Sequence, residues 1–490
     1  MLSALIWIPA IAAAIISFFP GVTPRIARWT AFTTTVGMLI LSLVLVSKFE
    51  LLNSNWQFQE YFPWIEHLGF TYHLGVDGLS LPLIVLNGLL GAIAIYSTDQ
   101  LNHRPRFYYA LILLLNAGVT GAFLAQDLLL FFLFYELELI PLYLLIAIWG
   151  GQRREYAAMK FLIYTAVSGI LVLIGFLGLV GLSGATSFTY DTALSSVLPL
   201  TTQILLLSTI LLGFAIKTPL VPFHTWLPDA HVEASTPISV LLAGVLLKLG
   251  TYGLVRFGLG LFPEAWSVLA PWLATWAVVS VLYGVFAAIT QKDMKKMVAY
   301  SSIGHMGYVL LGAAAGTAVS LTGAIFQMVS HGLISALLFL LVGVVYSKTG
   351  TRDLNKLKGL LNPEQGLPVI GSLMILAVMA SAGIPSMAGF VAEFLCFRGS
   401  FMVYPVQTVL CMLATGLTAV YFLILLDNAF FGRIQEDIAP ESVKWSERIP
   451  GIILAVIIIF LGVQPGFLTG KSDATTTAML APLPTISQRF

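Results

Sequence analysis

The sequence predicts an all-α integral membrane protein, and three observations support this fold class. Of the 490 residues, 58% are hydrophobic and only 10% are charged, whereas a soluble domain carries about 25% charged residues. Apolar stretches recur along the whole chain, and a bilayer core of about 30 Å needs roughly 20 such residues per helix. The loops between the stretches are short. We therefore expect one multi-spanning domain over residues 1–470 and a short polar C-terminal tail over residues 471–490.

The apolar stretches number about fourteen, and each is bounded by polar or turn residues. The predicted transmembrane helices cover residues 2–19, 30–47, 78–97, 107–125, 127–149, 157–182, 203–226, 236–262, 267–290, 297–316, 318–346, 367–402, 405–431 and 450–468. The first stretch lacks the basic residues that open a signal peptide, so we expect it to be a retained helix.

Lysine and arginine are distributed unevenly over the connections. Those after odd-numbered spans hold Arg25, Arg28, Arg104, Arg106, Arg153, Arg154, Lys160, Lys292, Lys295, Lys296, Lys348, Arg352, Lys356, Lys358, Arg433, Lys444 and Arg448. The opposite side holds only Lys48, Arg256 and Arg398, with Lys471 and Arg489 in the tail. By the positive-inside rule, the odd-to-even loops lie in the cytoplasm and both termini lie on the lumenal side.

Two predicted spans are broken by proline. Span 7 holds three prolines within residues 219–228, and span 12 is interrupted around Pro385. Proline removes a backbone donor, and such breaks normally face protein or a wet cavity. Their separation by five spans suggests two five-helix repeats over about 107–262 and 267–431, and an odd helix number makes such repeats inverted. Ordinary proline kinks without a repeat are the alternative.

Several functional classes are excluded by composition. The two cysteines, Cys396 and Cys411, lie in apolar stretches without CxxC spacing, which argues against zinc and iron–sulfur sites. The chain has no Walker A loop and no dinucleotide fingerprint in a βαβ context. Its net charge of +1 gives no basic footprint for nucleic acid. We therefore expect this chain to bind no cofactor, metal or nucleic acid.

Six titratable side chains fall near mid-membrane depth when positions are counted at about 1.5 Å per helical residue. They are Glu136, Lys217, Lys248, His305, His331 and Glu393. An ionised side chain at the centre of a span costs about 3 kcal/mol on insertion scales. Six such groups at one depth predict a proton relay more readily than isolated structural ion pairs.

The residue types suit that chemistry. Glu136 and Lys217 can neutralise each other, and their separation would favour release of the lysine proton toward Lys248. His305 and His331 titrate nearest physiological pH, so they can carry the proton onward. Glu393 would be the terminal group. A static salt bridge and two satisfied buried histidines are the alternative interpretation.

A second carboxylate of span 5 requires separate treatment. Glu138 lies two positions from Glu136, which is about 200° of rotation on a helix. The two carboxylates therefore cannot share a face. We assign Glu136 to the relay and expect Glu138 to contact another helix or subunit.

Polar groups also follow the break in span 7. His224, Asp229, His231 and Glu233 lie in or beside a loop on the predicted cytoplasmic side. They could give protons access to the relay, or they could equally be solvated loop residues.

These segments resemble the antiporter-like subunits of complex I and the Mrp-type Na+/H+ antiporters over roughly residues 75–430. The specific stretches are residues 217–231 (KTPLVPFHTWLPDAH), 242–248 (LAGVLLK) and 300–307 (YSSIGHMG). The resemblance implies that proton translocation depends on the span 5 carboxylate, the lysines of spans 7 and 8 and the last titratable residue of span 12. Those positions fall on Glu136, Lys217, Lys248 and Glu393.

Within that family, the glutamate at position 393 resembles the chain 4 group, because the chain 2 and chain 5 relatives have lysine there. Residues 135–143 and 149–154 resemble the cyanobacterial and plastid NAD(P)H–plastoquinone oxidoreductases. The resemblance implies a thylakoid membrane, with NAD(P)H or reduced ferredoxin as the electron donor. Iron–sulfur clusters and plastoquinone are then expected in partner subunits.

The same resemblance implies a set of partners. They are the antiporter-like chains 2 and 5, small membrane subunits, a peripheral electron-transfer arm and lipids. In variants that serve carbon dioxide uptake, a carbon dioxide-hydrating subunit is added. Two other functions fit the sequence: a free-standing cation/proton antiporter, which would transport when expressed alone or with Mrp partners, and a structural anchor subunit that moves no protons.

Overall fold

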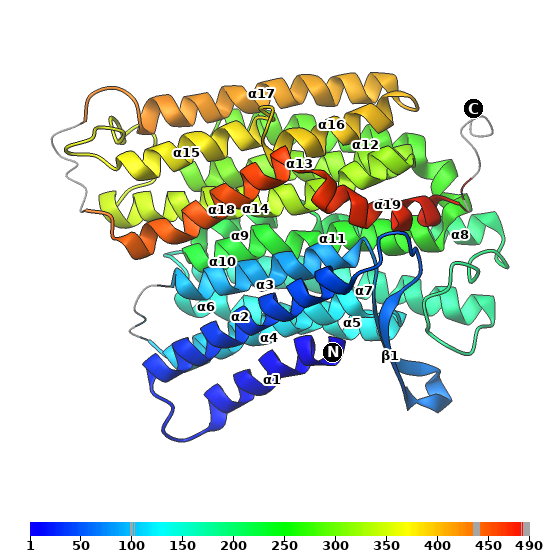
Figure 1. The fold of residues 1–490 in the computed structure, drawn as a ribbon. Helices are drawn as coiled ribbons and strands as arrows, with labels where there is room; N and C mark the ends of the chain where they lie inside the picture. Colours follow the sequence, from blue (N-terminus) through cyan, green and yellow to red (C-terminus); the bar gives the residue numbers. More distant parts are fainter. Residues whose placement is uncertain (99–100, 102, 435–441, 482, 484–490) are drawn as a thin grey trace.

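The protein is a bundle of helices whose axes run side by side, seen here in a computed structural model that describes residues 1–98, 101, 103–434, 442–481 and 483. The N-terminal helices occupy one side of the bundle and the helices of residues 368–429 the other, with the middle of the chain between them (Figure 1). The loops gather at the two ends of the bundle. We call the end at the left of Figure 1 the basic end, because it holds the loops at residues 19–23, 150–153, 290–293 and 350–367.

The first half of the chain forms α1 (Leu2–Phe18), α2 (Pro24–Lys48), α3 (Ser80–Tyr96), α4 (Pro105–Leu124), α5 (Leu128–Leu137), α6 (Leu139–Trp149), α7 (Arg154–Ser183), α8 (Leu200–Lys217), α9 (Trp226–Glu233), α10 (Thr236–Leu241) and α11 (Leu247–Gly253). The second half forms α12 (Pro263–Ile289), α13 (Met294–Ala315), α14 (Ala318–Thr349), α15 (Pro368–Ser381), α16 (Ala388–Phe401), α17 (Pro405–Ala429), α18 (Trp445–Val463) and α19 (Gly466–Leu480). Short π-helical segments at Leu242–Leu246 and Leu254–Leu259 flank α11.

Every apolar stretch predicted to span the membrane contains one or more helices in the structure. Among the described residues, ten helical segments are by themselves long and apolar enough to cross a bilayer. This confirms a mostly helical, multi-pass membrane protein.

The expectation of an all-α fold was wrong in one place. Between α2 and α3, β1 (Gln57–Ile65) and β2 (Phe70–Val76) form an antiparallel hairpin that projects from the end opposite the basic end (Figure 1). Aromatic residues recur along both strands, and these residue types favour extended backbone. Gly69 follows the short turn with φ 63°, a conformation that glycine adopts without steric cost.

The two predicted breaks are present, and a third was missed. Residues 218–225 separate α8 from α9, and residues 382–387 separate α15 from α16. The third break, at Glu138, divides α5 from α6. Pro141 explains it, because proline has no amide hydrogen to donate to the carbonyl of Leu137 one turn earlier.

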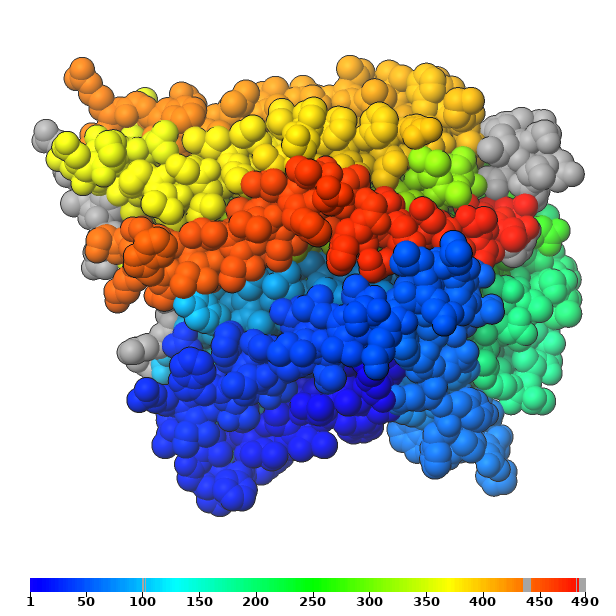
Figure 2. Space-filling model, viewed as in Figure 1, coloured from blue at the N-terminus to red at the C-terminus, as the bar shows by residue number. Residues whose placement is uncertain are grey.

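Part of the predicted polar tail is a packed helix, α19. Its Ser472 hydroxyl donates to the carbonyl of Gly78 at 3.0 Å, and the Gly78 amide donates to the Thr475 hydroxyl at 2.9 Å. Figure 2 shows α18 and α19 lying across the face between the N-terminal helices and the later ones. Small polar side chains therefore serve here as helix contacts. Residues 484–490 of the predicted tail lie outside the described part of the chain.

One carboxylate joins the hairpin to the start of α5. An oxygen of Asp127 accepts hydrogen bonds from the amides of Leu129 and Leu130, at 3.0 and 3.1 Å, and so caps the helix. Its other oxygen accepts from the amide and hydroxyl of Thr71 in β2, at 3.0 and 2.9 Å. Asp127 thus fixes where α5 begins and ties it to β2.

We expect Asp127→Ala to destabilise the protein, because losing an N-cap alone costs about 0.5–2 kcal/mol and the Thr71 bonds are lost with it. Asp127→Asn, which keeps one acceptor oxygen, should lie between Ala and wild type. Thermal unfolding of the purified complex, followed by tryptophan fluorescence, measures this. Equal transition temperatures for wild type and Asp127→Ala would contradict it.

Candidate functional site

The first buried charge pair lies where three helix ends meet. α8 ends at Lys217, two residues before Pro219, which has no amide hydrogen to donate to the carbonyl of Ala215. The Lys217 ammonium forms an ion pair with the carboxylate of Glu138 at the break between α5 and α6. Lys217 is 2% exposed and Glu138 is fully buried. Each charge is therefore compensated by the other in an apolar surrounding.

This pairing corrects the predicted partner of Lys217. Glu138 contacts another helix, as predicted, but through Lys217 itself, so the expected Glu136–Lys217 pair was wrong. Glu136 instead places its carboxylate against Gly169 of α7, where a methyl group at the glycine would collide with it. The 200° rotation that separates the two carboxylates lets only one of them face α8.

Residues that the sequence did not single out surround the pair. The Lys217 ammonium lies 4.3 Å from the centroid of the Tyr135 ring, within the range of a cation–π contact. The Tyr135 hydroxyl lies 2.8 Å from that of Ser168, which donates to the carbonyl of Gly213 in α8 at 2.7 Å. Tyr135 directly precedes Glu136. Its place beside a mid-membrane acid is the sequence signal that could have identified Tyr135 as part of the site.

The second buried lysine lies between two π-helical segments. Lys248, in α11, is fully buried. Its ammonium donates to the carbonyl of Ala243 and lies 2.8 Å from Nδ1 of His331 on α14. Since π-helical turns are frequent at functional sites in helices, their place on both sides of Lys248 supports a role for this residue.

From His331, the polar chain continues through α13 to α16. The ring centroids of His331 and His305 are 5.6 Å apart. His305 Nδ1 lies 3.5 Å from a carboxylate oxygen of Glu393, and its Nε2 lies 3.1 Å from the hydroxyl of Ser381 at the end of α15. The structure therefore brings four of the six predicted groups into one line: Lys248, His331, His305 and Glu393.

A small cavity accompanies this line. It has a volume of about 10 Å³ and is lined by His305, Gln327, His331, Ser381 and Glu393, among others. This is close to the space that one water molecule needs. The surroundings are polar, so a water there could complete a path between the imidazoles and the carboxylate.

The Lys217–Glu138 pair and the histidine line are adjacent but not joined by hydrogen bonds between described residues. Gly250 of α11 packs directly against the backbone of Lys217 and Thr218, and a side chain at that glycine would collide with them. The two helices that carry the lysines therefore touch within three residues of Lys248.

The polar residues after the span 7 break separate into two groups. Asp229 and Glu233 lie toward the basic end, where Asp229 pairs with Lys160 at 2.7 Å and Glu233 accepts from the amide of Arg153 at 2.9 Å. His231 points the other way, and its ring stacks on Phe339 with centroids 4.3 Å apart.

His224 lies within the break itself. It is buried, and its ring packs edge-on against Tyr283, with centroids 4.6 Å apart. Neither ring nitrogen of His224 has a hydrogen-bond partner among the described residues. His224 is therefore separated from the Lys248 line and lies against α12.

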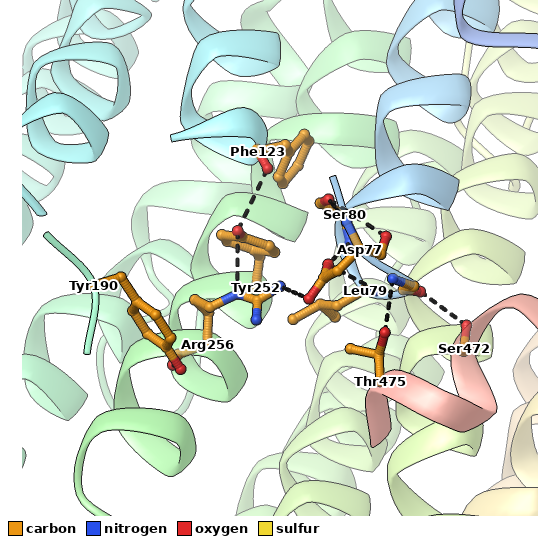
Figure 3. A network of polar contacts seen from close by, with 10 residues as sticks. Asp77, Leu79, Ser80, Phe123, Tyr190, Tyr252, Arg256, Ser472 and Thr475 are labelled. Carbon is orange, nitrogen blue, oxygen red and sulfur yellow. Dashed lines mark hydrogen bonds and ion pairs between the residues drawn. The ribbon is translucent and has the colours of Figure 1, made fainter. Parts of the chain in front are cut away.

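A third polar network, at the end opposite the basic end, was missed (Figure 3). Arg256 forms a buried ion pair with Asp77, and its guanidinium lies 4.4 Å from the centroid of the Trp56 ring. Gly78, next to Asp77, is held by α19. The sequence argument used Arg256 only for orientation. The network fixes the span that carries Lys248 at its end opposite the basic end.

Among the described residues, no group of three or more His, Cys, Asp or Glu side chains could hold a metal ion. The site consists of acids, lysines, histidines and hydroxyl groups, which are suited to holding and passing protons.

Comparison with known proteins identifies the family. Residues 125–418 match the family model described as "NADH:quinone oxidoreductase/Mrp antiporter, TM". The chain is 43% identical to NAD(P)H-quinone oxidoreductase chain 4 2 of Microcystis aeruginosa, over 88% of this chain and 79% of the relative. It is 42% identical to NAD(P)H-quinone oxidoreductase chain 4-2 of Synechocystis sp., over 98% of this chain and 92% of the relative.

Solved structures show the same fold. A chain of respiratory complex I from Thermus thermophilus superposes with a TM-score of 0.87 at 27% identity, covering 98% of this chain and all of that one. A chain of the Mrp complex from Dietzia sp. superposes with a TM-score of 0.88 at 21% identity, covering all of this chain and 98% of that one. The chain therefore belongs to the family of membrane subunits shared by NADH:quinone oxidoreductases and Mrp antiporters. Within the family it groups with the chain 4 subunits of NAD(P)H-quinone oxidoreductases.

The packing of Glu136 against α7 gives a matched pair of variants. Gly169→Ala should displace the Glu136 carboxylate, whereas Gly181→Ala, on the same helix, meets open space. If Glu136 belongs to the proton path, Gly169→Ala lowers proton uptake per electron and Gly181→Ala leaves it unchanged. Proton uptake by the reconstituted complex measures this. Equal proton uptake in both variants would show that Glu136 does not belong to the proton path.

Proposed function

We propose that this chain moves protons across the membrane through the Glu/Lys/His relay, driven by electron transfer from NAD(P)H or ferredoxin to plastoquinone in other subunits. The observation that carries the proposal is the contact line from Lys248 through His331 and His305 to Glu393. All four groups are almost fully buried. Keeping titratable groups buried in a membrane costs free energy, so several of them within reach of one another support a functional path.

The Lys217–Glu138 pair would act as the switch of this relay. While the ions are paired, the carboxylate of Glu138 compensates the charge of the Lys217 ammonium. Separation would leave the ammonium unpaired in apolar surroundings, which favours loss of its proton toward Lys248. The break at Glu138 and the end of α8 at Lys217 give both groups freedom to move without bending a continuous helix.

We further propose that the bundle contains about fourteen spans and two inverted five-helix repeats, over about 107–262 and 267–431. Two aspartates support the repeats. Asp127 caps α5 and bridges to Thr189 in the loop after α7, and Asp293 caps α13 and bridges to Asp353 in the loop after α14. In the predicted span order, both hold equivalent positions, at the start of the second span of each repeat.

The placement of the chain follows from its basic end. We propose that this end faces the cytoplasm, that both termini lie on the lumenal side and that the membrane is a thylakoid. Partners would be the antiporter-like chains 2 and 5, small membrane subunits and the electron-transfer arm. More specifically, we propose that the complex is a variant for carbon dioxide uptake that includes a carbon dioxide-hydrating subunit. Co-purification of that subunit would test this.

The first test of the relay is Lys217. We expect Lys217→Ala to leave an assembled complex with strongly impaired proton pumping, because Glu138 can take up a proton to avoid an unpaired buried charge. Lys217→Arg keeps the charge and should also fail, because arginine does not release its proton. Quinone-linked proton uptake and complex abundance on native gels are measured together.

The outcomes of that test separate the alternatives. Normal pumping by Lys217→Arg would limit this lysine to an electrostatic role. Loss of the assembled complex in Lys217→Ala would favour a structural anchor subunit. Cation-dependent transport by the chain expressed alone or with Mrp partners would favour a free-standing antiporter.

The second test is the terminal group. Glu393 lies 3.5 Å from His305, and we expect Glu393→Lys to retain more pumping than Glu393→Ala, because the position needs a titratable group. Proton uptake by reconstituted complexes compares the two. Equal uptake in both variants would show that Glu393 does not end the relay.

A further inference from the structure

A cavity of about 480 Å³ opens at the basic end, between the two halves of the chain. Its lining includes Trp149, Glu233, Ser235, Thr236, Lys295 and Arg352. These residues come from α6, the end of α9, the short link to α10, the start of α10, α13 and the loop after α14. The cavity is large and polar enough to hold many water molecules.

Lys295 is the buried cation of this cavity. It is the second residue of α13 and only 4% exposed. Its ammonium donates to the carbonyl of Ala234 at 2.6 Å, which holds it at the cavity wall. The neighbouring lysine, Lys296, is half-buried and does not line the cavity.

The charged groups that face Lys295 interact with other residues. Arg352 lies 3.4 Å from Asp293, and Glu233 accepts from the backbone amide of Arg153. Among the described residues, Lys295 forms no ion pair of its own. A buried lysine without a carboxylate partner can exist in both protonation states, as a proton-transferring group must.

His231 lies deeper than the cavity. It is fully buried, and neither of its ring nitrogens has a hydrogen-bond partner among the described residues. The Lys295 ammonium is held by Ala234, three residues after His231. The His231 ring stacks on Phe339 of α14, the helix whose His331 contacts Lys248. Buried polar atoms are nearly always hydrogen-bonded. We therefore expect the two unpaired ring nitrogens of His231 to bind water or a transferred proton.

We propose that Lys295 is the group that takes protons from the cytoplasmic cavity and passes them through His231 to Lys248. The proposal rests on the relay function proposed above. It assigns the first step of the path to a lysine outside the six predicted relay residues, and it joins the cavity to the line that ends at Glu393.

Each step is a balanced proton transfer. A hydronium ion in the cavity gives a proton to the neutral Lys295 amine, so an O–H bond breaks and an N–H bond forms. The Lys295 ammonium then gives a proton to one ring nitrogen of His231, and the imidazolium releases the proton on its other nitrogen toward the neutral amine of Lys248. Lys295 returns to its neutral form, and no other reactant is required.

The surface carboxylates cannot take this role alone. Asp229 is paired with Lys160 and does not line the cavity, and Glu233 accepts a hydrogen bond from the backbone amide of Arg153. Glu233 lines the same cavity as Lys295, where its negative charge would concentrate protons.

The test compares two adjacent lysines in the intact complex. Lys295→Ala should lower the rate of proton uptake by roughly 100-fold or more, because a positioned acid–base group typically contributes about 10²-fold or more. Lys296→Ala, one residue along the same helix, should pump like wild type. Adding methylamine should restore pumping to Lys295→Ala, since a small amine fits the cavity and can carry the proton, and a merely structural role would not be rescued.

A conservative variant keeps the proposal falsifiable if Lys295→Ala does not assemble. Lys295→Arg can keep the bond to the Ala234 carbonyl and the positive charge but does not release its proton. We expect an assembled complex that pumps poorly. Wild-type pumping by Lys295→Arg or Lys295→Ala would overturn the role of Lys295. If Lys217→Ala also pumped normally, the relay itself would fail, whereas impaired Lys217→Ala with normal Lys295 variants would reject only this inference.

Discussion

The cost of placing charge in an apolar bundle governs the arrangement of this protein. Each buried ion of the site meets a helix irregularity or a counter-charge: Glu138 lies at the break between α5 and α6, and Lys217 at the end of α8. Lys248 lies between two π-helical segments. Irregular backbone presents carbonyl groups that an ammonium can bind, as Ala243 does for Lys248. Breaks of this kind are tolerated in membranes only where protein surrounds them, which places them at the centre of the bundle.

The two halves of the chain meet at the histidines. Lys248 belongs to the first half, whereas His331, His305 and Glu393 belong to the second, and the 2.8 Å contact between Lys248 and His331 crosses from one to the other. On the opposite side, Asp77 and Arg256 fix the far end of the same span, with α19 closing over the loop (Figure 3). One end of this span is thus fixed by an ion pair, while its middle holds Lys248 between two π-helical segments, which are frequent at functional sites.

The buried titratable residues could be located from the sequence, but their partners could not. Charged residues deep in apolar stretches are visible because each violates the pattern around it. Whether Glu136 or Glu138 faces Lys217 depends on helix rotation, and one residue changes that rotation by about 100°. The break before Pro141 changes it again. Lys295 was counted only as a topology marker, because its burial results from Ala234 and the loop after α14, which are distant in sequence.

The sequence by itself determined the membrane class, the helical segments, the two proline breaks and the side of the bilayer on which the basic loops are expected. These properties follow from composition and local spacing, which need no knowledge of neighbours. Only the tertiary structure decided the hairpin, the packed α19, the Lys217–Glu138 pair and the line from Lys248 to Glu393. Those depend on which faces of distant helices meet, and that is set by packing over the whole bundle rather than by any local stretch of residues.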